Sequence, residues 1–365
     1  MNIKVITRHN PSNYGSLLQS IATLHVLEEL GHNAQIIDYQ RKDERGIKAT
    51  IAQVNQKAGY SHNVIKKILY ILIRYPMETI TRLRFDSMRK RYLNLTQRFC
   101  QSEQLTSLAA DTYMTGSDQV WGPLYNGKYD TAYFLSFVKY GRKLAYASSF
   151  GKAEFCQDVI KEYKQLLSTY DAIAVREDSA VKLLSEWNIA CKGQVLDPTL
   201  MLNGRQWAKM IQKEKYGKYV LVYQIHNDTN LNKYAVRFAQ NVGLPLIRVS
   251  PHLHQMNRGG KFVWCPDVLE FLAYIKGCTY LITDSFHGTC FAINFNRQFI
   301  ELLPNTSTGS RNQSILRVTG LENRILKTLD DFSIADDIIN YDKVNDILEK
   351  ERVASMHILE NMLNI

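Results

Sequence analysis

The sequence predicts an α/β fold of two domains, each built on an open, doubly wound sheet, with a cleft between the carboxyl ends of the two sheets. Two observations predict this fold. The chain has 365 residues, which is more than one compact core usually holds. Short apolar segments typical of strands alternate with helical patterns along most of it. Open α/β sheets bind ligands at the carboxyl ends of their strands, so we expect the functional site in the cleft.

The first predicted domain covers residues 1–205. Its opening strand, helix and strand form a unit that implies a parallel pair, with Gly31 ending the helix. Residues 40–62 are polar and are predicted to form a loop. The predicted strands are 2–7, 33–39, 111–115, 143–149, 172–176 and 194–196, and the predicted helices are 16–30, 63–95, 156–168 and 178–187.

The second predicted domain covers residues 206–365. It repeats the alternation of strands and helices and ends in further helices from residue 313 onward. The predicted strands are 219–225, 244–249, 280–283 and 299–303, and the predicted helices are 231–242, 267–275 and 288–295. Two facing domains of this kind leave the cleft described above.

A basic helical insertion, residues 63–98, interrupts the first domain. Nine basic and only two acidic residues lie between Val64 and Arg98, so seven of the chain's net +10 charges fall in this segment. Pro76 is predicted to break its helix. Beyond the proline an apolar stripe is expected, made of Met77, Ile80, Leu83, Met88, Tyr92 and Leu95.

Two interpretations of this insertion are open. Its apolar stripe could pack on the body of the protein and leave a solvated basic face, or the segment could bind an anionic lipid surface as a peripheral membrane contact. Nucleic acid is not predicted as a partner, because no aromatic–basic alternation or known binding module is visible.

Composition favours a cytoplasmic protein. The six cysteines form no CxxC pair and several lie in apolar surroundings, as reduced thiols do. The start MNIKVITRHN resembles neither a signal peptide nor a membrane anchor. A peripheral position at the inner face of the membrane stays open through the basic insertion.

Polar residues gather where strand 280–283 is predicted to end. The stretch TDSFHGT supplies Asp284, Ser285, His287, Gly288 and Thr289. N–H groups at a helix start favour an anion, Gly288 allows close approach, and His287 can transfer protons near neutral pH. Two interpretations are open: a catalytic anion site, or a helix cap with His287 as a structural hydrogen bonder.

Similar corners follow strands of the first domain. They supply Asn13, Tyr14, Gly15, Ser16, Ser117, Asp118 and Ser149. Arg176 also ends a strand, where it either grips a carboxylate or phosphate or pairs with Glu177 or Asp178. Asp118 either caps the backbone of its turn or takes part in catalysis. His252 and His254 lack a third ligand nearby, so we predict no metal site.

Taken as a set, these stretches resemble the polysaccharide pyruvyl transferase family. The resemblance is spread in order over most of residues 1–326. The matching pieces are NYGSLLQSIATLHVLEELGHNAQIIDY (13–39), TGSDQVWGP (115–123), YASSFG (146–151), AVREDSA (174–180), VLDPTLM (195–201), LITDSFHGTCFAINFNRQFIEL (281–302) and SRNQSILRVTGLENR (310–324).

The resemblance implies two Rossmann-like domains in a GT-B-like arrangement. It also implies a transferase that moves a pyruvyl group from phosphoenolpyruvate onto a sugar of a cell-surface polysaccharide or its precursor, lipid-linked or nucleotide-linked, with release of phosphate and no cofactor. His287 is then the general acid, with Asp118, Asp284 or His287 itself as the base. Arg176 and Arg311 hold donor anions. The remaining substrate-binding candidates are Asn13, Tyr14, Gly15, Ser16, Ser117, Ser149, Ser285, Gly288 and Thr289.

One position departs from the family pattern. Many members carry an arginine two residues before the histidine, where this chain has Ser285. Either Arg311 replaces that cation or this branch uses a different donor. Two other functions stay open: a GT-B-type glycosyltransferase that uses a nucleotide sugar, and a non-catalytic protein that binds glycan or membrane.

Overall fold

The structure, a computed structural model, describes residues 1–41, 46–55, 64–123, 129–152, 154–304 and 309–364. Its strands are β1 (Asn2–Ile6), β2 (Asn33–Ile36), β3 (Thr112–Thr115), β4 (Arg142–Ser148), β5 (Ala172–Val175), β6 (Val220–Tyr223), β7 (Leu246–Ser250), β8 (Lys261–Trp264), β9 (Tyr280–Thr283) and β10 (Gln298–Glu301). Its α-helices are α1 (Tyr14–Glu29), α2 (Gly46–Asn55), α4 (Val64–Tyr92), α5 (Gln157–Leu167), α6 (Asp178–Glu186), α7 (Pro198–Met201), α8 (Gly204–Met210), α9 (Thr229–Asn241), α10 (Val268–Gly277), α11 (Phe286–Asn294), α12 (Ser310–Thr319) and α13 (Tyr341–Asn364).

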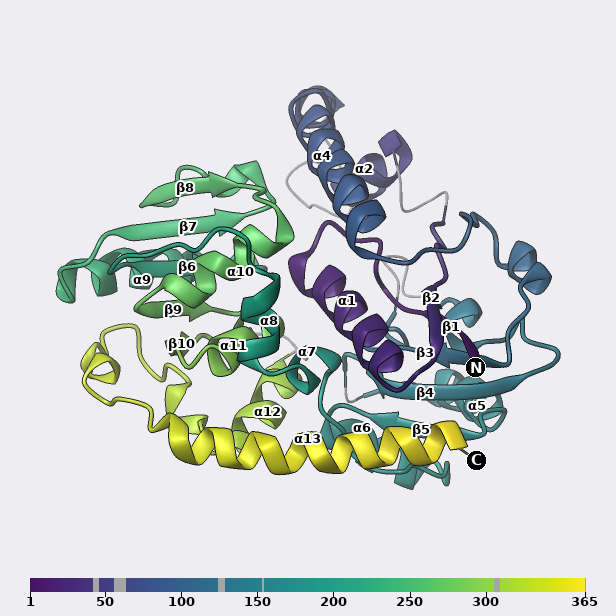
Figure 1. Cartoon of the computed structure of the whole chain (residues 1–365). Coiled ribbons are helices and arrows are strands. Elements are labelled where there is room, and N and C mark those ends of the chain that lie inside the picture. The colour runs from purple at the N-terminus through teal and green to yellow at the C-terminus, as the bar shows by residue number, and fades with distance from the viewer. Residues whose placement is uncertain (42–45, 56–63, 124–128, 153, 305–308, 365) are drawn as a thin grey trace.

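The strands form two five-stranded sheets in which every paired neighbour is parallel. The first sheet has the order β2-β1-β3-β4-β5 and the second β10-β9-β6-β7-β8. The two sheets lie side by side in Figure 1, with helices between and around them. The predicted α/β class with two doubly wound sheets is therefore confirmed.

Two predicted elements were wrong, and one strand was missed. Residues 194–196 make only an isolated bridge, between Gln194 and Val175 at the edge of the sheet. The loop predicted at 40–62 contains α2, although 42–45 and 56–62 lie outside the described residues. The four-residue edge strand β8 was missed because it is short and follows two glycines.

The expected break at Pro76 is also wrong. α4 runs without interruption from Val64 to Tyr92 with Pro76 inside it. Proline removes one helical hydrogen bond and crowds the carbonyl four residues earlier. Pro76 and Leu72 are both exposed in the structure, so water can solvate the freed carbonyl and the helix continues.

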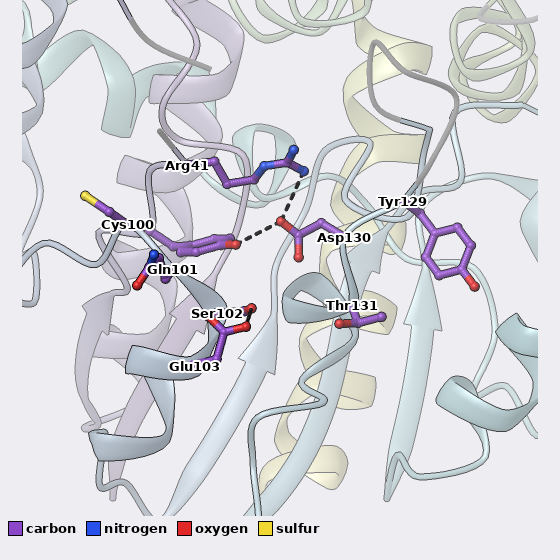
Figure 2. Close-up of a pocket in the computed structure, with 9 residues that line it drawn as sticks. Arg41, Cys100, Gln101, Ser102, Glu103, Tyr129, Asp130 and Thr131 are labelled. Carbon is purple, nitrogen blue, oxygen red and sulfur yellow. Dashed lines mark hydrogen bonds and ion pairs between the residues drawn. The ribbon is translucent and has the colours of Figure 1, made fainter. Parts of the chain in front are cut away.

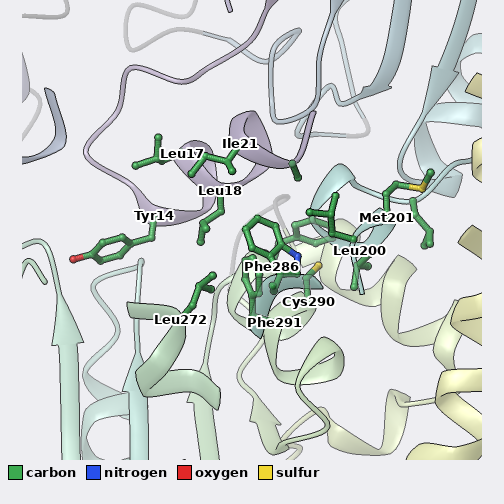
Figure 3. Packing of buried hydrophobic residues seen from close by; sticks show 14 of the residues in the cluster. Tyr14, Leu17, Leu18, Ile21, Leu200, Met201, Leu272, Phe286, Cys290 and Phe291 are labelled. Atoms are coloured by element: carbon green, nitrogen blue, oxygen red, sulfur yellow. The ribbon is translucent and has the colours of Figure 1, made fainter. Parts of the chain in front are cut away.

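α1 is the element that joins the two halves of the molecule. Nearly all of its side chains are buried, and Figure 3 shows Leu18 directed toward Leu272 of α10 and Phe286 of α11. The Tyr14 ring stacks on Phe271 at 4.3 Å between centroids, and its hydroxyl donates to the Pro266 carbonyl at 2.8 Å. One continuous apolar cluster therefore fixes the start of α1 against the second sheet's helices.

The last helix also spans both halves (Figure 1). Near its end, the Arg142 guanidinium of β4 donates to the carbonyls of Met362 and Leu363. The Leu196 amide donates to the Ser355 hydroxyl at 2.9 Å. The predicted boundary between residues 205 and 206 stays a prediction. Among the helices described, none has the length and apolar character needed to cross a membrane.

Candidate active site

Arg176 lies at the centre of the cluster where the first sheet's loops meet α11. It follows β5 directly and is buried. Its guanidinium faces three carboxylates: Nη1 lies 2.8 Å from Asp197 Oδ2, Nη2 lies 3.6 Å from Asp118 Oδ1, and Nε lies 3.5 Å from Glu177 Oε2. The guanidinium also covers the Phe286 ring at 4.6 Å. Burial alone would lower the pKa of Arg176, but the three carboxylates raise it, so it stays charged.

Asp197 ties this arginine to the second half of the molecule. Its Oδ1 caps α7 by accepting from the Thr199 amide at 2.9 Å. Its Oδ2 accepts from the Ser117 hydroxyl at 2.6 Å. Burial would raise the pKa of Asp197, but His287, Arg176 and the Ser117 hydroxyl together hold it well below its usual range. Asp197 is therefore a fixed negative charge at the junction.

Asp118 is held in a strained turn after β3. Its φ is +77°, in the left-handed region that costs a non-glycine residue about 1–2 kcal/mol. Its Oδ2 accepts from the Ser16 hydroxyl of α1 at 2.7 Å, and its Oδ1 accepts from the Gln119 amide at 2.8 Å. Burial opposes ionisation, yet Arg176, His287 and Arg311 lower the pKa of Asp118. The turn aims this carboxylate at the cations.

His287 reaches the same cluster from the first turn of α11. It is 6% exposed, and its Nε2 lies 3.7 Å from Asp197 Oδ2, which is too far for a hydrogen bond but close enough for a charge contact. Gly15 packs against the other side of the ring. A Cβ at position 15 would lie 2.2 Å from His287 Nδ1, so only glycine leaves room for the imidazole.

Arg311 adds a second cation from α12. Its side chain is partly buried and the neighbouring groups are Arg176, Asp118, Glu177 and Asp197. Burial, together with the like charge of Arg176, lowers the pKa of Arg311 to about 10, which still leaves it charged at neutral pH. Two guanidinium groups thus approach one another, which a bound anion would stabilise.

Some buried donors of this cluster have no hydrogen-bond partner. Within the described residues they are Arg311 Nε and His287 Nε2, whereas Arg176 Nε and Nη2 make only the longer ion-pair contacts to Glu177 and Asp118 given above. The start of α11 lies beside them, and there the Ser285 side chain accepts from the Gly288 amide at 3.2 Å. Unsatisfied buried donors cost about 1–3 kcal/mol each, so their clustering marks a place built for an acceptor-rich ligand.

The structure separates the other predicted residues of the second domain from this cluster. Asp284 accepts from the Ile225 amide at 2.7 Å and from the His226 amide at 2.9 Å, so both of its oxygens are occupied. The Thr289 hydroxyl lies within hydrogen-bond distance of the Ser285 carbonyl, at 3.1 Å, and of the Glu301 carboxyl. Ser285 caps the helix. Asp284, Ser285 and Thr289 therefore hold the corner together, as the capping interpretation expects.

Gly288 is required by packing. A Cβ there would lie 2.5 Å from the Thr283 hydroxyl and 3.2 Å from the Tyr223 ring, so α11 could not start so close to β9 with a larger residue. Its absence of a side chain fixes where the helix begins, and with it the position of His287.

In the first domain, Asn13 and Ser149 support the cluster from its edge. The Asn13 side chain caps α1 by accepting from the Gly15 amide at 2.8 Å. The Ser149 hydroxyl donates to Glu177 Oε1 at 2.6 Å. Tyr14, in contrast, is committed to the apolar interface with Phe271. The predicted candidates Ser16, Ser117, Asp118, Arg176, His287 and Arg311 come together, and Asn13, Gly15 and Ser149 lie beside them.

Sequence reasoning missed two residues of the cluster. Asp197 was not singled out within the stretch VLDPTLM, although the dipeptide Asp197-Pro198 is a typical helix start. Glu177 was considered only as an ion-pair partner of Arg176. It is that partner, and burial also raises the pKa of Glu177 against the opposing effect of Arg176 and Ser149. The signal for both was their place after a predicted strand of the first sheet.

A separate hollow of about 460 Å³ opens beside β2. Figure 2 shows its wall, where Asp130 accepts from the Arg41 guanidinium at 3.4 Å and from the Tyr39 hydroxyl at 3.0 Å. None of the cluster residues around Arg176 lines it. Within the described ranges, no group of three or more His, Cys, Asp or Glu side chains is placed to hold a metal ion.

Comparison with known proteins bears on the family and the fold. The family model described as polysaccharide pyruvyl transferase matches residues 13–307. The S. aureus MnaA–UDP co-structure has a TM-score of 0.50 at 13% identity, over 98% of this chain and 90% of that one. UDP-GlcNAc 2-epimerase from Neisseria meningitidis, bound to UDP-GlcNAc, has a TM-score of 0.50 at 11% identity, over 100% of this chain and 99% of that one. This likeness confirms the predicted GT-B-like fold and shows the fold alone. No curated protein sequence matches the chain.

Proposed function

The chain belongs to the polysaccharide pyruvyl transferase family, and from that premise we propose that it moves the pyruvyl group of phosphoenolpyruvate onto two hydroxyls of a sugar as a ketal. The sugar belongs to a surface polysaccharide or to its precursor. The observation that carries this proposal is the pair of side-chain nitrogens without a hydrogen-bond partner, Arg311 Nε and His287 Nε2, beside the charged guanidinium of Arg176. Phosphoenolpyruvate offers a carboxylate and a phosphate, and guanidinium groups pair with both in a planar, bidentate fashion.

The donor anions fit the cations of this cluster. Arg311 is partly exposed and Arg176 is buried, so a ligand reaches Arg311 first and Arg176 at the bottom of the cluster. The amides at the start of α11 favour a phosphate or carboxylate oxygen beside them. Arg311 also stands in for the arginine that many family members carry where this chain has Ser285.

His287 supplies the proton that starts the reaction. It protonates the methylene carbon of the donor while a sugar hydroxyl oxygen bonds to the neighbouring enol carbon. The negative charge of Asp197 Oδ2 lies 3.7 Å from Nε2 of this imidazole. A second hydroxyl oxygen then bonds to the same carbon as phosphate leaves with its electron pair. One hydroxyl proton ends in the new methyl group and the other on phosphate, so the step balances.

The neutral imidazole left after protonation is the base for the sugar hydroxyl. Asp284 cannot take that role, because both of its oxygens accept from backbone amides. Asp118 is a weaker base, since Arg176, His287 and Arg311 lower the pKa of its carboxyl despite burial. Asp118 instead holds Arg176 and the Ser16 hydroxyl in place.

Thermal unfolding with phosphoenolpyruvate tests the donor. A ligand at about a hundred times its Kd stabilises the folded protein by about 2.7 kcal/mol. We expect stabilisation of the wild type, loss of it in Arg311→Met, and retention in Arg317→Met, since Arg317 lies on the same helix but pairs with Asp178 at the surface. Phosphate release with a panel of sugar acceptors then identifies turnover.

Two results would redirect the proposal. Stabilisation by UDP but not by phosphoenolpyruvate would favour a nucleotide-sugar transferase on the same fold, since the two structural neighbours were solved with UDP or UDP-GlcNAc. Equal stabilisation of the Arg311→Met and Arg317→Met variants would remove Arg311 from the donor site.

A further inference from the structure

The outer face of α4 is apolar and exposed among the residues that the structure describes. Its exposed fractions reach 70% at Val64 and 79% at Ile65. In Figure 1 this end of α4 projects from the body beside α2. The exposed large apolar side chains of the helix are Val64, Ile65, Ile68, Leu69, Leu72, Ile73, Ile80 and Leu83. A contiguous set of large exposed apolar side chains on a protein surface usually marks a binding surface.

These side chains share one side of the helix. They recur at intervals of three, four and seven residues, so at about 100° per residue they cover one half of the helix surface. The buried residues of α4 are Thr81, Phe85, Met88 and Arg89, which lie on the other half. The expectation that the apolar stripe packs on the body is therefore wrong for Ile80 and Leu83, and correct for Met88.

Positive charge surrounds this outer face. Lys66, Lys90 and Arg91 are exposed along the same helix. Both acidic residues of α4 contact arginines of the helix itself: Glu78 pairs with Arg74, and Asp86 pairs with Arg89 at 2.8 Å. The helix thus combines an apolar face with a net positive charge.

We propose that α4 docks along its length on an anionic phospholipid bilayer. Its apolar face enters the boundary between headgroups and acyl chains, and its basic residues bind the headgroups, which is how amphipathic basic helices bind membranes. A second copy of this chain is the less favoured occupant, because pairing two such faces would bring like charges together. Charge complementarity therefore selects the lipid surface.

The body-facing half of α4 makes this docking rigid. The Thr81 hydroxyl donates to the Pro251 carbonyl at 3.0 Å, and Arg84 donates to the Cys265 carbonyl at 3.3 Å. Arg89 donates to the His9 carbonyl at 3.3 Å, four residues before the Asn13 cap of α1. A bilayer bound to α4 is thereby held in a fixed relation to both halves of the molecule.

Vesicle co-sedimentation tests the docking without any turnover. The full chain should bind vesicles with about one third phosphatidylglycerol, and bind pure phosphatidylcholine roughly tenfold more weakly. Combined Ile68→Gln, Leu69→Gln and Leu72→Gln substitutions should weaken binding roughly tenfold or more. The matched control replaces three exposed large side chains elsewhere, at least 63% exposed, with Tyr140→Gln, Ile338→Gln and Val353→Gln, and should bind as the wild type does.

A second measurement does not depend on the folding of the triple variant. Leu72→Trp keeps the face apolar, and brominated lipids should quench its fluorescence, whereas Val353→Trp on α13 should not respond. Equal responses at the two positions, or no binding of the wild type to anionic vesicles, would overturn the proposal. Concentration-dependent dimerisation that the triple variant abolishes would also overturn it, because a second copy would then cover the face.

Discussion

The site is built from two parts of the chain that use their polar residues in opposite ways. The first corner is the set of strand ends and loops directly after β1, β3, β4 and β5, and the second corner is the turn between β9 and α11. In the first domain, Ser117, Asp118 and Arg176 contact one another and the charged groups from the rest of the cluster. In the second corner, Asp284 and Ser285 accept from backbone amides of the second domain. His287 is the polar side chain of this corner that contacts Asp197 across the junction. The first corner therefore supplies the charge of the site, and the second supplies one well-placed imidazole.

Backbone geometry follows the same division. In the first corner, two non-glycine residues have a positive φ: Asp118, just after β3, at +77°, and Ala147, at the end of β4, at +54°. The register between β4 and β5 also shifts between Ala145 and Ser148. Among the described residues of the second corner, from Thr283 to Thr289, none has a positive φ. Strain is stored where side chains must converge from several loops, and the capped helix start needs none.

The largest effect that this comparison predicts is at His287. His287→Gln should reduce kcat by roughly 10²–10⁴-fold, the usual contribution of a general acid, with little change in stability. The matched control is His226→Gln, since His226 is the histidine that contacts Asp284 in the same corner. Phosphate release measures both. Equal losses in the two variants would show that the second corner acts as a unit and not through one imidazole.

Gly15→Ala should have the next largest effect, because it tests the contact between the two corners. The new Cβ would overlap His287 Nδ1, so the ring must move. A displacement of about 1 Å costs roughly 10²-fold in rate. Measured kcat should therefore fall although no charged group is removed. An unchanged kcat would mean that the imidazole position is not set by α1.

Asp197→Asn removes the negative charge that links the two corners. It should reduce kcat roughly tenfold or more, because a hydrogen bond or contact to a charged group is worth about 1.5–3 kcal/mol. Because the pKa of Asp197 is lowered in the folded protein, its contribution to stability is present above its ordinary pKa of about 3.9 and is lost as pH falls below it. Stability should depend less steeply on acid pH in Asp197→Asn. Identical acid profiles would argue against a paired carboxylate.

The fold was largely predictable from the sequence because strand and helix patterns are local. Residues 2–6, 33–36 and 280–283 alternate with apolar helices, and each forms the strand expected of it. The errors arose where a short pattern carries little information, as at β8, or where exposure relieves a local conflict, as at Pro76.

The site was predictable only as a set of strand ends. Parallel strands bring their carboxyl ends to one edge, so polar residues after each strand were expected to meet. Which of them meet depends on partners far apart in the chain: Ser16 bonds Asp118 across 102 positions, and Asp284 bonds the Ile225 amide across 59. Such pairings leave no periodic signal, so capping and catalytic interpretations could not be separated before the structure.

The smallest predicted effect separates the two helix caps. Ser285→Ala and Asn13→Ala each remove a cap that accepts from backbone amides, and each should lower the free energy of unfolding by about 1 kcal/mol. Their effects on rate should differ. Loss of the Ser285 cap leaves His287 confined by Gly15, so kcat should stay within about threefold of the wild type. Loss of the Asn13 cap frees Gly15 and Ser16, which hold the imidazole and Asp118, so kcat should fall further. Equal kcat in the two variants, with equal stability, would mean that the first corner is no more sensitive to its backbone than the second.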